Sequence, residues 1–488
     1  MTHKKHKKLP LIFSVLVFFL FSCTGPVGPA GENGIDGQNG INGQNGIDGQ
    51  NGIDGYTDIT HYIVFFSNGG VFEDGGIMQM VIADKGIVSP PAVSRMVFNF
   101  SGWFTQATGG DEFDFSQPLT KSHTLYAKWE PVYFTGLQEA SYYLLTYPGG
   151  YTPADPVPLP VNIDLGDTKL EDSGWQNLLE KISDVGKYVS LDLSPCDIAG
   201  DSFDTVFYIS KGKNLIVSLV LPDKTREIPN ASRYEVAFRY FLNLRSISAA
   251  NLEFIGGYSF TDLYNLNSVN FPLLIDIGYL AFSGCLSLST VHFPLVKSIG
   301  SFAFNNCTDL ISINIPVVTD IDVGAFYQCT SLTGVDFPLI KTIKSETFYD
   351  CMSLASVNLP LVEYIGEDAF YNCSSLQGIN LPLAETLKGG VFYGCTLLSN
   401  VEIPGAVYIG DYNYTGTFYD CPALSSVTLG STPPYLEDTR TPIFGGCTPA
   451  AFTIRRPAEN ADEYNVWRFN NSVHFNNLSF NIVFADSN

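Results

Sequence analysis

From Phe304 to Ala325 the sequence reads FNNCTDLISINIPVVTDIDVGA, and Phe326 then begins the same pattern again. The pattern has a period of 22 residues, which is clearest in a column of cysteines that later widens to intervals of 26. A fixed period of this size is typical of solenoids, in which each coil buries its core only against its neighbours. The cysteines of the column are Cys285, Cys307, Cys329, Cys351, Cys373, Cys395, Cys421 and Cys447.

Further columns share this period. A phenylalanine stands three residues before each cysteine, and a proline recurs in the same frame from Pro272 to Pro404. Segments such as 269–271 and 335–337 alternate apolar and polar residues, which predicts short strands with one buried face. Stacked coils would pair these strands in a parallel sheet and bring the phenylalanines into one interior file. A second apolar column is predicted to fill the opposite wall: Ile277, Ile299, Ile321, Ile343, Ile365, Leu387 and Ile409.

This order of Phe, Cys, Leu and Pro resembles the BspA-like leucine-rich repeats. The resemblance covers about residues 175–457 and implies a mainly β fold, a leucine-rich repeat solenoid with coils of about 22 residues. We assign the solenoid to residues 173–457 and expect degenerate early strands at 191–194 and 219–222 and near Ile247. The remaining tail, residues 458–488, is predicted to be a C-terminal cap, because the end coils of a solenoid need covering.

An amphipathic helix is predicted just before the first strands. Trp175, Leu178, Leu179 and Ile182 fall at i, i+3, i+4 and i+7, and Ser173 is placed to cap the helix. The preceding segment, residues 131–172, is rich in proline and glycine, which predicts an irregular connector between domains.

The N-terminus has the features of an export signal. Four lysines precede an apolar run from Leu9 to Phe21, which is too short to span a bilayer as a mature helix. The tetrapeptide that ends in Cys23 resembles the lipobox of bacterial lipoproteins. The resemblance implies that residues 1–22 are a lipoprotein signal peptide and that Cys23 is acylated, which would place the chain on the cell surface at the outer membrane. An ordinary signal peptide with an incidental cysteine is the alternative.

Residues 23–57 are predicted to form the lipid anchor and a stalk. Glycine occupies every third position from Gly25 to Gly55, a period that resembles bacterial collagen-like stalks. The only prolines are Pro26 and Pro29, so a triple helix would be marginal without help from neighbouring segments. The pattern therefore leaves two states open, a trimeric stalk and a flexible single-chain spacer.

Residues 58–130 are predicted to be a small β module. The strings at 61–70, 100–104, 113–116 and 124–129 resemble the Listeria-Bacteroides repeat of internalins and other surface proteins. The resemblance implies a β-grasp-like fold with a spacer or binding role. Asp111, Glu112 and Asp114 lack the spacing of a calcium loop, so we expect a solvated acidic turn there.

Charge and motifs exclude several functions. Lys and Arg number 26 against 49 Asp and Glu, a net charge of −23, which argues against nucleic acid as a partner. The sequence contains no zinc motif, no phosphate-binding loop and no Gly-x-Ser-x-Gly elbow, so we predict no enzyme, no metal and no cofactor. The cysteine column could form serial disulfides, but reduced cysteine is a good small core residue, and we expect free thiols.

Two exposed columns are candidate binding surfaces. The first, here called the strand face, contains the outward residues of the predicted strands: Asn270, His292, Asn314, Asp336, Asn358, Asn380 and Glu402. The second, here called the tyrosine strip, follows the buried phenylalanines by one residue: Tyr327, Tyr349, Tyr371, Tyr393 and Tyr419. The alternative for the strip is that its rings only stack on one another.

The resemblance also suggests a function. BspA-like proteins are associated with adhesion to host matrix proteins such as fibronectin and fibrinogen and with co-aggregation of bacteria. It therefore implies a surface lipoprotein adhesin or interaction scaffold whose partners are host matrix proteins or other bacterial surfaces, with glycans as a further ligand class. The alternative is a structural or envelope-assembly protein with no host ligand, since fold does not determine function.

Overall fold

The structure is a computed structural model, and the region it describes begins after the predicted stalk. It describes residues 61–82, 88–205, 211–234, 236–411, 415–437, 441–447, 452–475 and 482–486. The predicted signal peptide, Cys23 and the Gly-X-Y segment lie outside these residues. None of the helices in the described part of the chain is long and apolar enough to span a bilayer.

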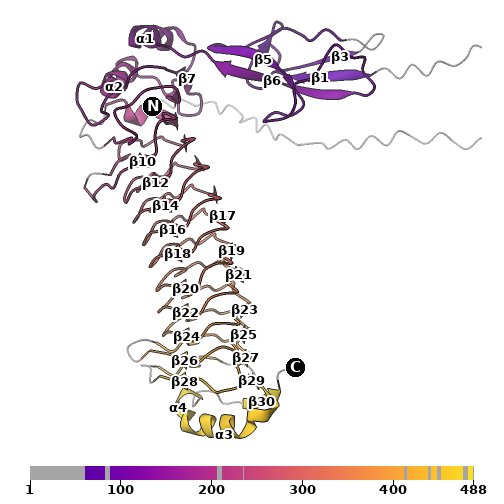
Figure 1. Cartoon of the computed structure of the whole chain (residues 1–488), viewed down its shortest axis with the longest axis vertical. Helices are drawn as coiled ribbons and strands as arrows, with labels where there is room; N and C mark the ends of the chain where they lie inside the picture. The colour runs from indigo at the N-terminus through magenta and orange to yellow at the C-terminus, as the bar shows by residue number, and fades with distance from the viewer. Residues whose placement is uncertain are drawn as a thin grey trace, which may run out of the picture. The chain divides into compact units, whose positions relative to one another are not determined.

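A small β module comes first, as the sequence predicted (Figure 1). Its four strands lie in the order β3-β1-β6-β5, with β1 and β6 parallel at the centre and antiparallel pairs outside. Alternation along the strands sends Phe65, Trp103 and Leu125 into one core. The strands of the sheet are β1 (Tyr62–Phe66), β3 (Met78–Ile82), β5 (Phe98–Phe104) and β6 (His123–Pro131), beside a ribbon of β2 (Val71–Phe72) and β4 (Val93–Ser94).

The predicted solenoid follows, and each coil adds one strand to a parallel ladder (Figure 1). Equivalent residues pair in register, as Val335 does with Val357, so the 22-residue period of the sequence is the repeat of the ladder. The strands expected at 191–194, at 219–222 and near Ile247 are present as β8 (Val189–Asp192), β9 (Ile216–Val220) and β11 (Ser246–Ser248).

This first ladder has two breaks in its pairing, between β13 and β15 and between β21 and β23, but one continuous succession of coils. Its strands are β7 (Val157–Pro160), β8 (Val189–Asp192), β9 (Ile216–Val220), β11 (Ser246–Ser248), β13 (Ser268–Asn270), β15 (Thr290–His292), β17 (Ser312–Asn314), β19 (Gly334–Asp336), β21 (Ser356–Asn358), β23 (Gly378–Asn380), β25 (Asn400–Glu402), β27 (Ser426–Thr428), β29 (Phe452–Arg456) and β30 (Ile482–Asp486).

A second parallel ladder runs along the opposite side of the coils (Figure 1). Its strands carry the second apolar column, which the sequence predicted as a wall of side chains without predicting that its backbone pairs. Each of these strands has two residues: β10 (Glu227–Ile228), β12 (Phe254–Ile255), β14 (Asp276–Ile277), β16 (Ser298–Ile299), β18 (Asp320–Ile321), β20 (Thr342–Ile343), β22 (Tyr364–Ile365), β24 (Thr386–Leu387), β26 (Tyr408–Ile409) and β28 (Tyr435–Leu436).

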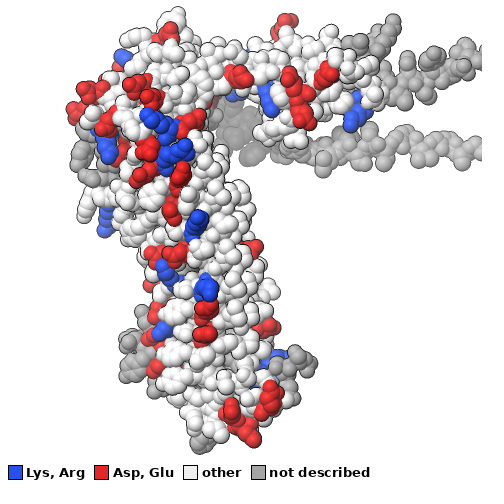
Figure 2. All heavy atoms as spheres, viewed as in Figure 1, with Lys and Arg blue, Asp and Glu red and all other residues white. Residues whose placement is uncertain are grey.

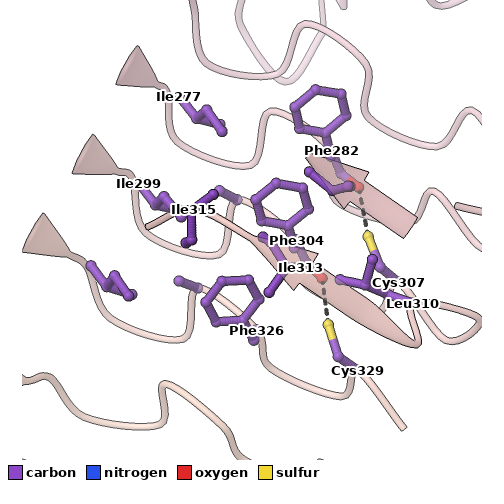
Figure 3. Close-up of a cluster of buried hydrophobic side chains, with 14 of the residues drawn as sticks. Ile277, Phe282, Ile299, Phe304, Cys307, Leu310, Ile313, Ile315, Phe326 and Cys329 are labelled. Carbon is purple, nitrogen blue, oxygen red and sulfur yellow. Dashed lines mark hydrogen bonds between the residues drawn. The ribbon is translucent and has the colours of Figure 1, made fainter. Parts of the chain in front are cut away.

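The interior contains the predicted file of phenylalanines (Figure 3). The rings of Phe304 and Phe326 stack with centroids 5.6 Å apart and planes 10° apart, and Phe326 stacks on Phe348 in the same way. All three side chains are fully buried, and each such burial stabilises the fold by about 2 to 3 kcal/mol. The prediction of one interior file is confirmed.

The cysteine column lies beside this file as buried free thiols. Each thiol of the column donates a hydrogen bond to the carbonyl oxygen of a phenylalanine one coil earlier, as Cys307 does to Phe282 and Cys329 to Phe304 (Figure 3). The eight sulfur–oxygen distances lie between 3.0 and 3.3 Å. Cysteine therefore fits the column for two reasons, because it is small and apolar and because it donates to a backbone oxygen.

The expectation of an irregular connector after the β module is wrong. This segment contains helix α1 (Leu137–Thr146) and strand β7, which pairs in parallel with β8. Strand β7 includes Pro158 and Pro160, and it tolerates them because it is the terminal strand of its sheet. The N–H groups of Val157 and Val161 point to β8, so the prolines occupy the positions whose missing N–H would point away from β8. On that outer side Phe134 donates its N–H to the Pro160 carbonyl at 3.0 Å.

Helices cover both ends of the solenoid core. Helix α2 (Gly174–Val185) buries the four apolar side chains that predicted it, and the Ser173 hydroxyl accepts a hydrogen bond from the Gln176 N–H, as an N-cap does. At the other end a 3-10 turn, η2 (Ala458–Asn460), leads into α3 (Ala461–Asn470) and α4 (Ser472–Phe475). Helix α3 packs Tyr464 and Trp467 onto the last coils, where Trp467 donates to the Pro434 carbonyl at 2.6 Å.

Candidate functional site

The five tyrosines of the strip lie in one stacked row. Consecutive ring centroids are 4.4 to 5.5 Å apart and consecutive ring planes differ by no more than 10°. All five residues are half-buried, so the row is packed against the protein and remains accessible to solvent. The row therefore offers a rigid amphipathic surface whose rings are already ordered.

The backbone fixes this row from coil to coil. The residue after each tyrosine donates its N–H to the carbonyl of the next tyrosine, as Gln328 does to Tyr349 at 2.7 Å and Asp350 to Tyr371 at 2.8 Å. These donors have a left-handed backbone, with φ of 58° at both Gln328 and Asp350. Left-handed geometry favours Gly, Asn and Asp, and it turns the chain so that the N–H faces the next coil.

The left-handed residues are structural supports of the tyrosine strip that the sequence analysis missed. They recur two residues after each buried phenylalanine, and a regular column of Asn, Asp and Gly at this offset was the available indication. The column consists of Asp262, Gly284, Asn306, Gln328, Asp350, Asn372, Gly394, Asp420 and Gly446.

The tyrosine strip has defined ends. At the N-terminal end the ring of Phe302 contacts the ring of Tyr327, with 60° between the two ring planes. In the two preceding coils the positions equivalent to Tyr327 are occupied by Asn305 and Ser283, which hydrogen-bond to each other. At the C-terminal end Gly445 replaces the aromatic residue, and a Cβ there would lie 2.6 Å from the ring of Tyr419. The strip is therefore a bounded surface rather than a property of every coil.

Carboxylates flank the strip and shape its electrostatics. Burial raises the pKa of Tyr327, and the nearby carboxylates of Asp350, Glu346 and Asp368 raise it further. Burial and the neighbouring Tyr371 likewise raise the pKa of Tyr349. The phenols therefore remain protonated hydrogen-bond donors in an acidic surrounding.

Asp368 is the most perturbed of these carboxyl groups. Burial, followed by repulsion from Glu346 and Glu367, raises its pKa to about 6. Gly390 in the next coil leaves space for this carboxyl, because a Cβ at Gly390 would lie 1.8 Å from Asp368 Oδ1. The acidic side of the strip is thus partly buried and packed against the next coil.

The strand face is also assembled as a column. Its residues pair side by side in register, as His292 does with Asn314 and Asn380 with Glu402. Most of its members are exposed, and Asn358 Nδ2 donates to Asp336 Oδ1 at 2.7 Å. The structure therefore brings each predicted set of residues into its own row, in different stretches of the coil.

Lys and Arg lie beside Asp and Glu in the view of Figure 2. Pairs such as Lys341 with Glu363 at 2.8 Å and Lys344 with Asp320 at 3.1 Å account for part of this arrangement. Among the residues that the structure describes, no group of three His, Cys, Asp or Glu side chains is placed to hold a metal ion. The lipidation candidate Cys23 lies outside those residues.

The fold is a leucine-rich repeat solenoid. It has two parallel strand ladders, a single stacked column of phenylalanines in its core and a repeat of 22 residues. The family model described as the BspA type leucine rich repeat region matches residues 231–352 and 341–476, together just over half of the chain. The chain belongs to this family. A second model, the Listeria-Bacteroides repeat domain, matches residues 61–128, which cover the β module. Repeats of both kinds are typical of bacterial surface proteins, and leucine-rich repeat proteins typically act as binding scaffolds.

Solved structures with similarity to the chain are also leucine-rich repeat proteins. One from Bacteroides ovatus is 19% identical, with 62% of this chain and 84% of that chain covered and a TM-score of 0.31. A leucine-rich cell surface protein from Faecalibacterium prausnitzii is 21% identical, with 54% and 83% covered and a TM-score of 0.25. One from Eubacterium ventriosum is 17% identical, with 67% and 91% covered and a TM-score of 0.33. No curated protein matches the chain significantly.

Proposed function

We propose that this chain is a lipid-anchored adhesin of the bacterial cell surface, and that its tyrosine strip binds protein partners. In this proposal Cys23 carries the acyl chains at the outer membrane, and the solenoid presents its rows outward. The BspA-type family suggests an interaction scaffold or adhesin, and the stacked tyrosines are the observation that carries the choice of surface.

The physical argument for the strip rests on preorganisation. Tyrosine is enriched at the energetic centres of interfaces because it combines a large apolar ring with a hydroxyl. Ordering a free side chain on binding costs about 0.5 to 1.5 kcal/mol, and most of this cost is already met in a stacked, half-buried row. Because cross-coil hydrogen bonds also hold the backbone of the row, a partner meets a surface that needs little rearrangement.

The charges beside the strip indicate the chemistry of the partner. Asp350, Glu346 and Asp368 lie near the rings, so a partner segment with Lys or Arg next to apolar side chains would complement both features. Host matrix proteins such as fibronectin and fibrinogen, or proteins on other bacterial cells, are the proposed partner class, and glycans that stack on the rings are a second class. The polar strand face would serve as an additional contact row.

The test is a double substitution within the strip. Tyr349→Ser with Tyr371→Ser removes two central rings, and we expect the affinity for fibronectin, fibrinogen or whole bacterial cells to fall at least tenfold, which corresponds to about 1.4 kcal/mol. The matched control is Tyr234→Ser with Tyr264→Ser, which removes two exposed tyrosines outside the strip. Circular dichroism and urea unfolding establish that both variants remain folded.

The outcomes separate the two functional classes. Binding that is lost in the strip variant and kept in the control supports the proposal. Equal binding by the strip variant and the wild type would exclude the strip as the binding surface. No binding of the wild type to any matrix protein or cell would instead favour a structural or envelope-assembly role.

A further inference from the structure

The β module has a second face of its sheet, which is apolar and exposed. Phe65 and Leu125 point to the buried side, so the alternate residues of the same strands point to the other side. Register places the residues of β1 and β3 opposite one another on this side, and Phe66 of β1 stacks on Tyr126 of β6 at 5.4 Å. We call this surface the open face: Tyr62, Val64, Phe66, Met78, Met80, Ile82 and Tyr126.

The composition of the open face is unusual for a sheet exposed to water. Antiparallel strands with one buried face normally alternate apolar inward and polar outward residues. Here the outward residues of β3 are Met78, Met80 and Ile82, which are 54%, 60% and 59% exposed. Strand β3 is also an edge strand, and it has no charged residue and no proline to protect it from pairing. An exposed apolar patch of this kind marks an interaction surface.

The sequence before the module indicates what covers the open face. The last Gly-X-Y glycine is Gly55, seven positions before Tyr62, the first residue of β1. Seven residues span at most about 25 Å when extended. If the Gly-X-Y segments of three chains wind into a triple helix, three copies of the module are therefore held within that distance of one point.

We propose that three copies of this chain associate through the open faces of their β modules, directly after a trimeric stalk. Each part compensates for a weakness of the other. The Gly-X-Y segment has only two prolines, so its triple helix is weakly preorganised and gains stability from an adjoining contact that holds three chains together. The stalk in turn holds the three β modules close to one another.

The size of the open face agrees with this mutual dependence. Strands of five residues and three strand spacings give a sheet of about 17 Å by 14 Å, which is well below the roughly 800 Å² per partner of a stable free-standing interface. Module copies would therefore not associate tightly alone. A short tether raises their effective concentration to about the millimolar range, which a small apolar contact can exploit.

Charge gives an independent reason for using this face. Each chain has a net charge of −23, so copies of the chain repel one another over most of their surface. The seven residues of the open face are uncharged, and Lys128 and Glu130 follow Tyr126 on the same side of β6. The ammonium group of Lys128 lies over the ring of Phe104 at 3.6 Å. The seven residues of the open face thus form an uncharged patch on a chain with a large net negative charge.

The experiment measures the mass of the whole chain by sedimentation equilibrium in density-matched detergent. We expect three chains for the wild type. Met80→Glu introduces a charge at the centre of the open face and should raise the dissociation constant of the trimer at least tenfold. The matched control is Val71→Glu, which places the same charge on the exposed strand β2 outside this sheet and should leave the trimer intact.

Two further variants keep the test decisive. Tyr62→Ser removes an exposed ring from the open face without adding charge, and it should also weaken the trimer if Met80→Glu perturbs the module itself. Gly40→Ala interrupts the Gly-X-Y period and should dissociate the trimer with the module intact. A single-chain mass for the wild type, or trimers of unchanged stability in both open-face variants, would overturn the proposal.

Discussion

The Sγ atom of Cys329 lies 3.1 Å from the carbonyl oxygen of Phe304, one coil earlier in the stack. The same oxygen accepts the backbone N–H of Cys307 at 3.2 Å, so two cysteines from successive coils converge on one acceptor. This arrangement repeats along the column. It links neighbouring coils through the core, whereas the strand ladders link them through the backbone at the walls.

Thiol chemistry gives the first prediction. Burial raises the pKa of Cys329 to about 12, so almost no reactive thiolate exists at pH 8 in the native protein. Iodoacetamide should therefore modify the column very slowly in buffer and completely in urea, without added reductant. Mass spectrometry counts the modified cysteines. If denatured protein gained reactive thiols only after reduction, serial disulfides would replace the thiol ladder.

The left-handed backbone of Asp420 gives a second prediction. Its φ is 57°, a geometry that β-branched residues adopt only at a cost of about 1 to 2 kcal/mol. Asp420→Val should lower the free energy of unfolding by about that amount, measured by urea titration. Asp420→Gly and Asp420→Asn are the matched controls, because both residues accept this geometry, and they should remain within about 0.5 kcal/mol of the wild type. A valine variant as stable as the asparagine variant would contradict this account.

Asp368 gives a prediction about pH. Its pKa is raised to about 6, so the folded state favours the protonated carboxyl more than the unfolded chain does. The preference for the protonated carboxyl therefore adds fully to the free energy of unfolding below about pH 4. It is lost as the pH rises to about 6 and the Asp368 carboxyl ionises in the folded state. Asp368→Asn cannot ionise and should be more stable than the wild type at pH 7, by about 1 kcal/mol because the carboxyl is only partly buried and solvent screens it.

Urea unfolding at pH 4 and pH 7 measures this difference. The Asp368→Asn variant and the wild type should be nearly equal at pH 4 and separate at pH 7. Asp309→Asn removes a carboxylate at an exposed position and controls for the general effect of lowering the negative charge. A separation at pH 7 no larger than in this control would show that burial of Asp368 has no energetic effect.

The cap of helix α2 gives the fourth prediction. The Ser173 hydroxyl accepts the Gln176 N–H at 3.2 Å, and losing such a cap costs about 1 kcal/mol. Ser173→Ala should therefore lower hydrogen-exchange protection in α2, whereas Ser173→Gly should cost only a few tenths of a kcal/mol. Protection in the central coils, such as β19, should stay unchanged in both variants, since solenoid coils interact mainly with their neighbours. Equal protection of α2 in wild type and Ser173→Ala would refute a capping role.

Much of the solenoid was predictable because its residues repeat. Phe304, Cys307 and Leu310 return at fixed intervals, and a repeated column shows which side chains share an environment without any knowledge of the loops between them. The tyrosine row followed from the same reasoning, since a residue that recurs beside a buried phenylalanine must stack on its own copies. Helix α2 was predictable from its apolar spacing and its serine cap.

Other features of the structure leave no comparable pattern in the sequence. A strand of two residues, such as Asp320–Ile321, is too short to show a period, so the second ladder is visible only as a column of isoleucines. Strand β7 was missed because Pro158 and Pro160 argue against a strand until its position at a sheet edge is known. The carboxyl of Asp368 depends on the space left by Gly390, which is a relationship between two coils rather than within one.

The register of the coils also determines how the length of this protein can change. Each coil offers the next one the same phenylalanine, the same acceptor oxygen and the same left-handed turn, so an excised unit of 22 residues, such as 327–348, would leave matching ends behind. Each removed or duplicated unit would shift the far end by about 4.8 Å, the spacing of paired strands. The length of the solenoid is thus adjustable in small equal increments, without redesign of the core.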